Sequence, residues 1–457
     1  MRTWGKAVSA FVVLVGAAIL AEPVLGHAIG LGGAEAAGDA PFWFVVVTGG
    51  GIVGGSFLFA TLITDHEAIR VVNGWRLSVP VPPVIRRPVV VFVGLLGVAV
   101  LGSVMVVALV GPVYAESNAA VLLVWAGWWA GYTMTVYLVA DSWPVLDPWR
   151  RLASLLPQVR RPYPDRLGSW PAVVGLLGLV WLEVVSPVAV NPRLLGLVII
   201  GYTLVTLAGA VLFGRDAWFR YVDPISQVFR CFGRIAPIQR TRGGFSIGLP
   251  ASSLTTPTET SADEAAFIVA LLWATTYDGV VGIRPWALTA EFFVGLGVPP
   301  MLLYLGLLIG GYALFMVAYE LAARRARRTA DSLVSSSYVR RWFAPSLLPI
   351  AAGYHVAHFL GYFVQLSDQL LRTALDPMTV TTVSLVALPG WFGSLQLMFV
   401  IAGHLLAIWV AHALSFELFP GRLQPIRSQY PFTIVMIFYT MTSMWIVSQP
   451  YIPPPYV

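Results

Sequence analysis

Long apolar stretches separated by short polar segments recur along most of this chain. From residue 42 onward they cover about 42–64, 88–110, 121–141, 170–188, 195–214, 265–281, 298–320, 343–370, 392–419 and 431–449. Crossing a hydrocarbon layer of ~30 Å takes roughly 17 to 25 helical residues, so most of these stretches have the length of one span. The two longest, near the C-terminus, are predicted to tilt or to continue past the membrane. The pattern predicts an all-α, polytopic helical membrane protein with about ten transmembrane helices.

The first 26 residues have a different pattern. Arg2 and Lys6 precede a short apolar stretch at 10–21, and small residues follow around Gly26. A charged start, a short apolar core and small boundary residues are typical of a cleavable signal peptide. We therefore expect a signal peptide at 1–26, a mature protein that begins at His27, and one helical membrane domain over 27–457. The alternative is an uncleaved signal anchor, which would add an eleventh span.

Composition supports the membrane class and excludes several others. Hydrophobic residues make up 58% of the chain and charged residues 11%, and the mean hydropathy is +0.78, far from the values of soluble domains. The net charge of +6 does not indicate nucleic-acid binding, because the basic residues lie in short clusters between apolar stretches. A single cysteine, Cys231, excludes an intramolecular disulfide or a CxxC metal or redox motif. The lipid bilayer is thus the expected partner, and further membrane or extracytoplasmic subunits are left open.

The arginines are distributed asymmetrically between alternate loops. With residue 42 placed outside, the inner loops are 65–87, 142–169, 215–264, 321–342 and 420–430, and the outer loops hold only Arg193, Arg284 and Arg372. Arginine-rich loops of membrane proteins stay in the cytoplasm. The asymmetry predicts a multi-pass protein of a prokaryotic plasma membrane with both mature ends outside. Only Lys6 among the basic residues is lysine, as is typical of GC-rich prokaryotic genomes.

The longest inner loop, at about 215–264, is predicted to begin with a short helix at the membrane surface. Aromatic and basic residues are mixed at 215–220, whereas 252–261 is rich in serine and threonine. We expect the first part to lie in the interface and the second to form a loose cytoplasmic loop. The basic residues are interpreted as a solvated, lipid-facing surface, with a binding role as the alternative.

Five ionisable residues lie deep inside predicted spans, where burial in hydrocarbon is costly and function is concentrated. A rise of 1.5 Å per residue, counted from the inner span ends, places all five at roughly 18 to 22 Å. Imidazoles and carboxylates that converge from several helices can hold a transition-metal ion such as copper, zinc or iron. The predicted metal ligands are Glu183, Asp278, His355, His358 and His404.

The alternative for each of these residues is a satisfied hydrogen bond between helices. His412 lies about 12 Å beyond His404 along its helix, too far to share one ion. Asp141, Glu320 and Glu417 are near inner span ends, where a structural role is expected because their side chains can reach water.

Several short motifs between about residue 110 and the end share a recognisable pattern. They are Trp170-Pro171-Ala172, Trp181-Leu182-Glu183, Phe213-Gly214-Arg215 with Asp223-Pro224, Thr275 to Asp278, Gly353 to His358, Gly403-His404, Ala411-His412 and Gln429-Tyr430-Pro431 to Ser443-Met444-Trp445. Together these motifs resemble a prokaryotic polytopic membrane family that is often labelled fenitrothion hydrolase. The resemblance implies that the family's polar motifs are carried here by Glu183, Asp278, His355, His358, His404 and His412. The label implies hydrolysis of an organophosphorus ester, although the sequence has no nucleophile elbow.

Three functions are compatible with these residues. The first is binding and transport or transfer of a transition-metal ion, with His27 as an outer capture ligand. The second is a membrane-embedded, metal-dependent hydrolase of a hydrophobic ester, in which Glu183 or Asp278 is the base. The third is a haem-bearing electron carrier with axial ligands from the helices of His358 and His404.

Overall fold

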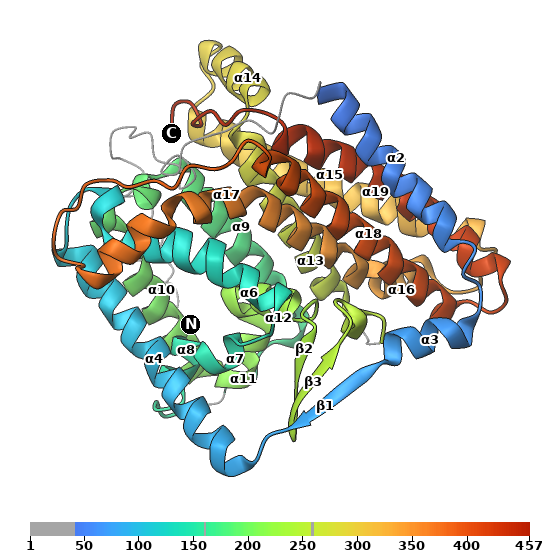
Figure 1. Ribbon diagram of the computed structural model, residues 1–457, viewed down its shortest axis with the longest axis horizontal. Helices are drawn as coiled ribbons and strands as arrows, with labels where there is room; N and C mark the ends of the chain where they lie inside the picture. Colours follow the sequence, from blue (N-terminus) through green and yellow to red (C-terminus); the bar gives the residue numbers. More distant parts are fainter. Residues whose placement is uncertain (1–41, 160, 257–259) are drawn as a thin grey trace.

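The computed structural model describes residues 42–457 apart from 160 and 257–259. The predicted signal peptide and the predicted mature N-terminus at His27 lie outside these residues. The described part is a bundle of long helices with a small sheet near one end (Figure 1). The fold is therefore all-α in character, as the apolar pattern predicts.

Nine helical segments of the described part are long and apolar enough to cross a membrane, and the predicted tenth is the shorter apolar helix α9 (Trp170–Val185). The segments confirm the predicted multi-span architecture. They are α2 (Phe42–Ala60), α4 (Pro83–Val110), the series α5 (Ala119–Leu122), η3 (Leu123–Tyr132) and α6 (Thr133–Leu138), α10 (Pro192–Phe213), α13 (Ala262–Val281), α15 (Pro300–Thr329), the series α16 (Ser336–Phe343), η8 (Ala344–Leu347) and α17 (Leu348–Leu375), α18 (Phe392–Leu418) and α19 (Leu423–Val447).

Some helices extend beyond the apolar stretches that predicted them. Helix α4 begins five residues early and α19 eight residues early, so Pro88 and Pro431 lie inside helices. Proline is tolerated there because neighbouring helices compensate the lost backbone hydrogen bond. Helix α15 continues to Thr329 on a polar turn in which Arg324 pairs with Glu320, one turn earlier, at 2.9 Å.

A three-stranded antiparallel sheet joins two segments that are far apart in sequence. Strand β1 (Arg76–Pro80) follows helix α3 (His66–Gly74), and the hairpin of β2 (Ile238–Thr241) and β3 (Gly244–Gly248) comes from the longest predicted loop. The strand order is β1-β3-β2, with Ser78 opposite Ser246 and Ser246 opposite Gln239. The backbone pairing therefore ties this loop to the start of α4.

The expectation of a loose loop at 252–261 is wrong for its described residues. The short helix η7 (Ser252–Leu254) buries Ser252 and Leu254, and Thr255 and Thr260 are buried as well. Ser252 and Thr255 donate side-chain hydrogen bonds to nearby carbonyls, which satisfies their hydroxyls away from water. Serine and threonine here are packed turn residues rather than solvated linker residues.

The first part of the same predicted loop is buried against the bundle. It forms α11 (Arg215–Ala217), the π-helix η6 (Trp218–Val222) and α12 (Pro224–Gly233), which is almost entirely buried. Two Asp-Pro steps begin neighbouring helices, since Asp147 caps α8 (Pro148–Ala153) and Asp223 caps α12 through backbone N–H groups. Ser226 Oγ also donates to Asp147, at 3.3 Å, which links the two caps.

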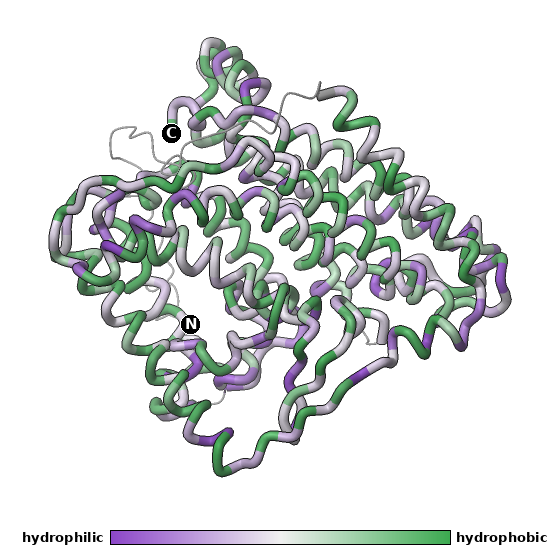
Figure 2. The backbone as a smooth tube through the Cα atoms, viewed as in Figure 1, coloured by the Kyte–Doolittle hydropathy of each residue, from purple (hydrophilic) through white to green (hydrophobic). Residues whose placement is uncertain are grey.

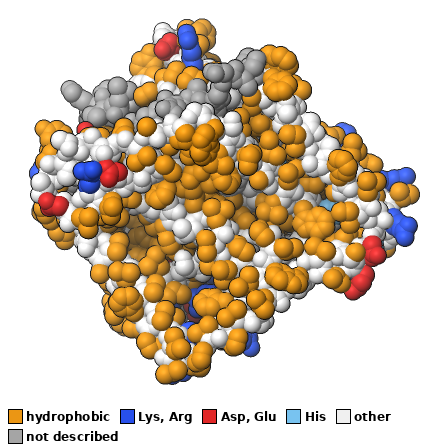
Figure 3. All heavy atoms as spheres, viewed as in Figure 1, with side chains coloured by type: hydrophobic (Ala, Val, Ile, Leu, Met, Phe, Trp, Pro, Cys, Tyr) orange, Lys and Arg blue, Asp and Glu red, His pale blue; other side chains and the backbone are white. Residues whose placement is uncertain are grey.

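The remaining short elements are η2 (Ala115–Ser117), α7 (Trp143–Leu146), η4 (Asp165–Leu167), η5 (Pro187–Ala189) and α14 (Arg284–Gly295). The sheet, α3 and α16 lie at one end of the bundle, here called the arginine-rich end, whereas α14 and the C-terminal segment lie at the opposite end (Figure 1). The long helices are mainly apolar along their length (Figure 2). The face in Figure 3 is broadly apolar, with charged side chains mostly near its margins. Such a surface suits a bilayer.

Candidate intramembrane site

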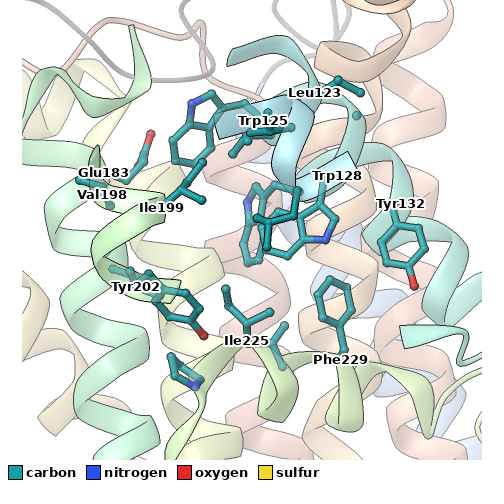
Figure 4. A pocket seen from close by; sticks show the side chains of 18 of the residues that line it. Leu123, Trp125, Trp128, Tyr132, Glu183, Val198, Ile199, Tyr202, Ile225 and Phe229 are labelled. Atoms are coloured by element: carbon teal, nitrogen blue, oxygen red, sulfur yellow. The ribbon is translucent and has the colours of Figure 1, made fainter. Parts of the chain in front are cut away.

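A cavity of about 530 Å³ lies among α4, η3, α9, α10, α12 and α13. Its wall is mostly aliphatic and aromatic (Figure 4). Pockets of this size and character hold drug-sized organic ligands. The aromatic lining residues are Trp125, Trp128, Trp129, Tyr132, Trp143, Trp149, Tyr202, Phe229 and Phe359.

Four of these rings come from η3, which is a ten-residue π-helix. π-Helices are rare, are usually a single turn, and are frequent at functional sites. The hydroxyl of Thr133, the residue after η3, donates to the carbonyl of Trp128 at 3.1 Å, which supports the widened backbone. The local sequence Trp125 to Tyr132 therefore presents an unusual density of rings to one cavity.

Asp278 and His358 form a contact between α13 and α17 at the cavity. Nε2 of His358 lies 2.9 Å from Oδ2 of Asp278, a distance at which the imidazole N–H donates to the carboxylate. Both side chains are mostly buried, with 14% and 12% of their surface exposed. Two of the five predicted ligands are therefore in contact with each other.

Gly279, next to Asp278, makes room for the neighbour of this pair. A Cβ atom at position 279 would collide with the hydroxyl of Tyr354, and would come within 2.8 Å of Ile446. The Tyr354 ring in turn stacks on His358, with centroids 5.7 Å apart and an interplanar angle of 24°. The absence of a side chain at Gly279 thus allows the tyrosine to hold the imidazole beside Asp278.

Glu183, on α9, lines the same cavity (Figure 4). Glu183 and Asp278 are both close enough to Tyr451 for their charges to act on its phenol. Tyr451 belongs to the segment after α19, which is anchored at α13 where the Ile452 N–H donates to the carbonyl of Gly282 at 2.8 Å. Burial raises the pKa of Tyr451, and the two carboxylates raise it further. Two predicted site carboxylates therefore share one neighbourhood.

His355 is fully buried and faces a different set of groups from His358. Its Nδ1 is 3.0 Å from the hydroxyl of Tyr137, and its ring contacts Trp129, Phe232 and Phe359. Its Nε2 is buried without a hydrogen-bond partner among the described residues. The two histidines are one turn apart, but only His358 contacts Asp278.

His404 is also fully buried, and its Nδ1 donates to the carbonyl of Val400 at 2.8 Å. The backbones of α17 and α18 touch at Gly353 and Gly403, where a Cβ on Gly353 would lie 2.8 Å from the Gly403 Cα. His358 lies five residues beyond Gly353 on α17, and His404 lies one residue beyond Gly403 on α18. Because the two helices are antiparallel, these displacements run in opposite directions and separate the two histidines by about 9 Å along the helix axes.

The prediction of one depth for His358 and His404 is therefore wrong by about 9 Å. The physical reason is that α17 and α18 are shifted along their axes relative to each other. Depths counted from the ends of the two spans therefore place His404 at the wrong level relative to His358. Within the described residues there is no group of three or more His, Cys, Asp or Glu side chains placed to hold one metal ion. The five predicted ligands divide into the Asp278–His358 pair, Glu183 on the same cavity, and two separately bonded histidines.

Two of the three acidic residues expected to be structural have ordinary partners, whereas Oδ1 of the third, Asp141, is buried without a hydrogen-bond partner among the described residues. Glu417 pairs with Arg70 at 2.6 Å, and Glu320 with Arg340 at 2.8 Å. His412 places Nε2 2.8 Å from the Ile63 carbonyl and Nδ1 3.2 Å from Gln429 Oε1. His412 thus joins α18 to the end of α2 and to α19.

Sequence reasoning missed most of the residues that give this site its character. The cavity wall depends on tryptophans and tyrosines, which the apolar pattern does not distinguish from other span residues. The spacing of Trp125, Trp128, Trp129 and Tyr132 was the available signal, since aromatic residues concentrated in one span favour a lined pocket. No protein-family model, curated protein or solved structure matches this chain.

Proposed function

We propose that the protein binds a hydrophobic organic molecule in the cavity, inside the membrane, and that the Asp278–His358 pair exchanges a proton as the molecule enters and leaves. The observation that carries this proposal is a carboxylate, Asp278, in the wall of a cavity lined mainly by apolar side chains, with His358 hydrogen-bonded to it. An apolar wall with few polar groups binds hydrophobic ligands and orients them.

Proton exchange follows from the surroundings of the pair. An imidazole hydrogen-bonded to a carboxylate can relay a proton to and from it, and excluding water from a carboxylate favours its protonated form. A hydrophobic ligand that fills the cavity removes water from the charged carboxylate beside the neutral imidazole, so Asp278 takes up one proton from solution as the ligand binds and returns it as the ligand leaves. Binding and proton uptake or release are therefore coupled in this proposal.

Saturable binding of the neutral fluorophore Nile red to protein in lipid nanodiscs tests the first half of the proposal. Val180→Trp adds bulk to a cavity-lining position of α9, and Val174→Trp adds the same bulk on the same helix where Val174 is 69% exposed. We expect Val180→Trp to weaken binding at least about tenfold and Val174→Trp to leave it unchanged. Equal binding by both variants, or no saturable binding above empty nanodiscs, would rule out the cavity.

The proposed proton exchange is tested with a pH-sensitive dye in a weakly buffered nanodisc sample. The wild type should change the dye signal when Nile red is added, whereas Asp278→Asn with His358→Gln should bind the fluorophore without that signal. An unchanged dye response in the double variant would exclude the pair as the exchange site.

For location, the arginine distribution supports a prokaryotic plasma membrane with the arginine-rich end in the cytoplasm. A reporter fused after Arg328 should then read cytoplasmic and one fused after Tyr451 external. The same location for both would contradict this orientation.

A transition-metal ion such as copper, zinc or iron is the second candidate ligand. The observation in its favour is that metal-binding histidines commonly donate their other ring nitrogen to a carboxylate, as His358 does to Asp278. Elemental analysis of the purified protein decides between the two. One equivalent of metal that is lost in His358→Ala would support the metal, and chelation that leaves Nile red binding unchanged would support the organic ligand.

A further inference from the structure

We infer that the cavity opens sideways into the hydrocarbon core of the bilayer, between α4 and η3, and that its ligand is a neutral lipophile without an ionised headgroup. This inference rests on the proposed function, because it names the route and the chemical class of the ligand for the same cavity. Two observations carry it: residues of α4 that belong both to the cavity wall and to the exposed surface, and a break in the packing of α4 at the same level.

Leu96 and Val100 of α4 line the cavity, although 47% and 44% of their surfaces are exposed. Helix α4 runs along the outer edge of the bundle (Figure 1). Side chains that are part of both the cavity wall and the outer surface mark an edge where the two meet. These residues are near the middle of the predicted span 88–110, which places the edge at the level of the hydrocarbon core rather than of the headgroups.

Helix α4 is packed closely on either side of Val100. Toward its start, Gly97 touches α7, where a Cβ would lie 2.0 Å from the carbonyl oxygen of Leu146. Toward its end, Val104 is in one buried cluster with Ala120 of α5. The interval from Gly97 to Val104 corresponds to roughly 10 Å of helix. Over this interval the opposite cavity wall is η3, against which α4 is not closely packed, so the cavity is open between them.

The chemistry of the opening defines the ligand. Every residue that α4 and η3 contribute to the cavity wall is uncharged, and the acidic residues of the described wall, Glu183 and Asp278, come from α9 and α13. A molecule that enters here must first reach the middle of the bilayer, where an ionised headgroup is costly to bury. Hydrocarbons and isoprenoids are already dissolved at that depth. The opening therefore selects neutral lipophiles over phospholipids, whose headgroups stay at the membrane surface.

Temperature-jump relaxation of Nile red fluorescence in nanodiscs that hold the protein tests the route, because the relaxation rate reports entry and exit whereas a titration reports affinity. Val100→Trp narrows the opening. Val106→Trp is the matched control, since it adds the same bulk to the same helix at a residue that is 54% exposed and does not line the cavity. Leu96→Trp, with Leu95→Trp as the control at a residue that is 58% exposed and outside the cavity wall, repeats the comparison should Val100→Trp fail to fold.

We expect Val100→Trp to slow the relaxation at least about fivefold while changing the affinity less than about twofold, because a narrowed opening slows entry and exit equally. Val106→Trp should change neither the rate nor the affinity. An unchanged relaxation rate in Val100→Trp, whatever its affinity, or equal slowing by Val106→Trp, overturns the route.

The ligand class is tested with hexadecane and hexadecylphosphocholine, which share one alkyl chain but of which only the second carries an ionised headgroup. Each is titrated against bound Nile red, at its measured mole fraction in the nanodisc lipid. We expect hexadecane to displace Nile red from the wild type at about tenfold lower mole fraction. A hexadecane value that is not lower, including no displacement by either compound, overturns the ligand class while saturable Nile red binding still upholds the cavity. The absence of saturable Nile red binding in the wild type instead refutes the proposed function.

Discussion

Replacing Gly279 by alanine should disturb the Asp278–His358 pair without changing either residue. The added methyl group would overlap the hydroxyl of Tyr354 and lie 2.8 Å from Cγ2 of Ile446. Tyr354 is 1% exposed and packed against His358, so it has little room to retreat. Inserting a methyl group into a packed core costs roughly 1–3 kcal/mol, and we expect Gly279→Ala to fall in the upper half of that range.

The substitution Tyr354→Phe separates this collision from other effects. The tyrosine hydroxyl has no hydrogen-bond partner among the described residues, so its removal should by itself be nearly neutral. In the Tyr354→Phe background the collision with oxygen disappears, and the contacts at 3.2 Å to the ring carbon and at 2.8 Å to Ile446 remain. We therefore expect the double variant to recover about 1–2 kcal/mol of the stability lost in Gly279→Ala.

Four proteins are compared: the wild type, Gly279→Ala, Tyr354→Phe and the double variant. Their unfolding in mixed micelles of SDS and a mild detergent, followed by circular dichroism, measures the coupling energy between positions 279 and 354. Nile red binding to the same proteins reports on the site. Gly279→Ala should weaken binding, and the double variant should recover part of it. If Gly279→Ala costs the same stability with and without the Tyr354→Phe substitution, the tyrosine hydroxyl is not what the glycine accommodates, and our account of how His358 is held is wrong.

Two further predictions concern polar groups that do not themselves line the cavity. Burial, together with the negative charge of Asp223, raises the pKa of Asp147 from 3.8 to about 7. The protonated carboxyl therefore stabilises the folded protein fully below pH 3.8, and this stabilisation is lost as the pH rises through 7. Asp147→Asn keeps a capping oxygen and should therefore show a smaller fall in melting temperature between pH 5.5 and 8.5 than the wild type; an equal fall would contradict this. His412→Ala removes the one N–H that a neutral imidazole donates to the Ile63 carbonyl or to Gln429 Oε1 and should cost about 1–3 kcal/mol, seen as a lower melting temperature with unchanged Nile red affinity. A stable His412→Ala protein would show that water replaces the ring.

Nine of the ten predicted spans are helical segments long enough to cross a membrane, and they could be predicted from the sequence because the bilayer imposes them locally. Each span must satisfy its own backbone and match one hydrocarbon thickness, so a window of about 20 residues contains the necessary information. The same reasoning identifies Asp278 and His358 as deeply buried ionisable residues, and they are in contact. Helices α4 and α19 begin earlier than predicted, at Pro83 and Leu423, because each accommodates a proline inside the helix.

Only the tertiary structure decided which groups the buried histidines contact. His355, His358 and His404 are similar on the sequence, yet they contact Tyr137, Asp278 and the Val400 carbonyl, respectively. The choice depends on the stagger and rotation of α17 against its neighbours, which is fixed by close contacts such as that between Gly353 and Gly403. No local window contains that information.

The cavity and the sheet were decided in the same way. The aromatic wall forms because the π-helix η3 meets α7 and α12, and the sheet forms because β1 pairs with β3 across more than 160 intervening residues. Hydrophobicity fixes which segments enter the membrane, since it acts on each segment separately. Packing between segments fixes which side chains come together, since it depends on the shapes of all of them at once.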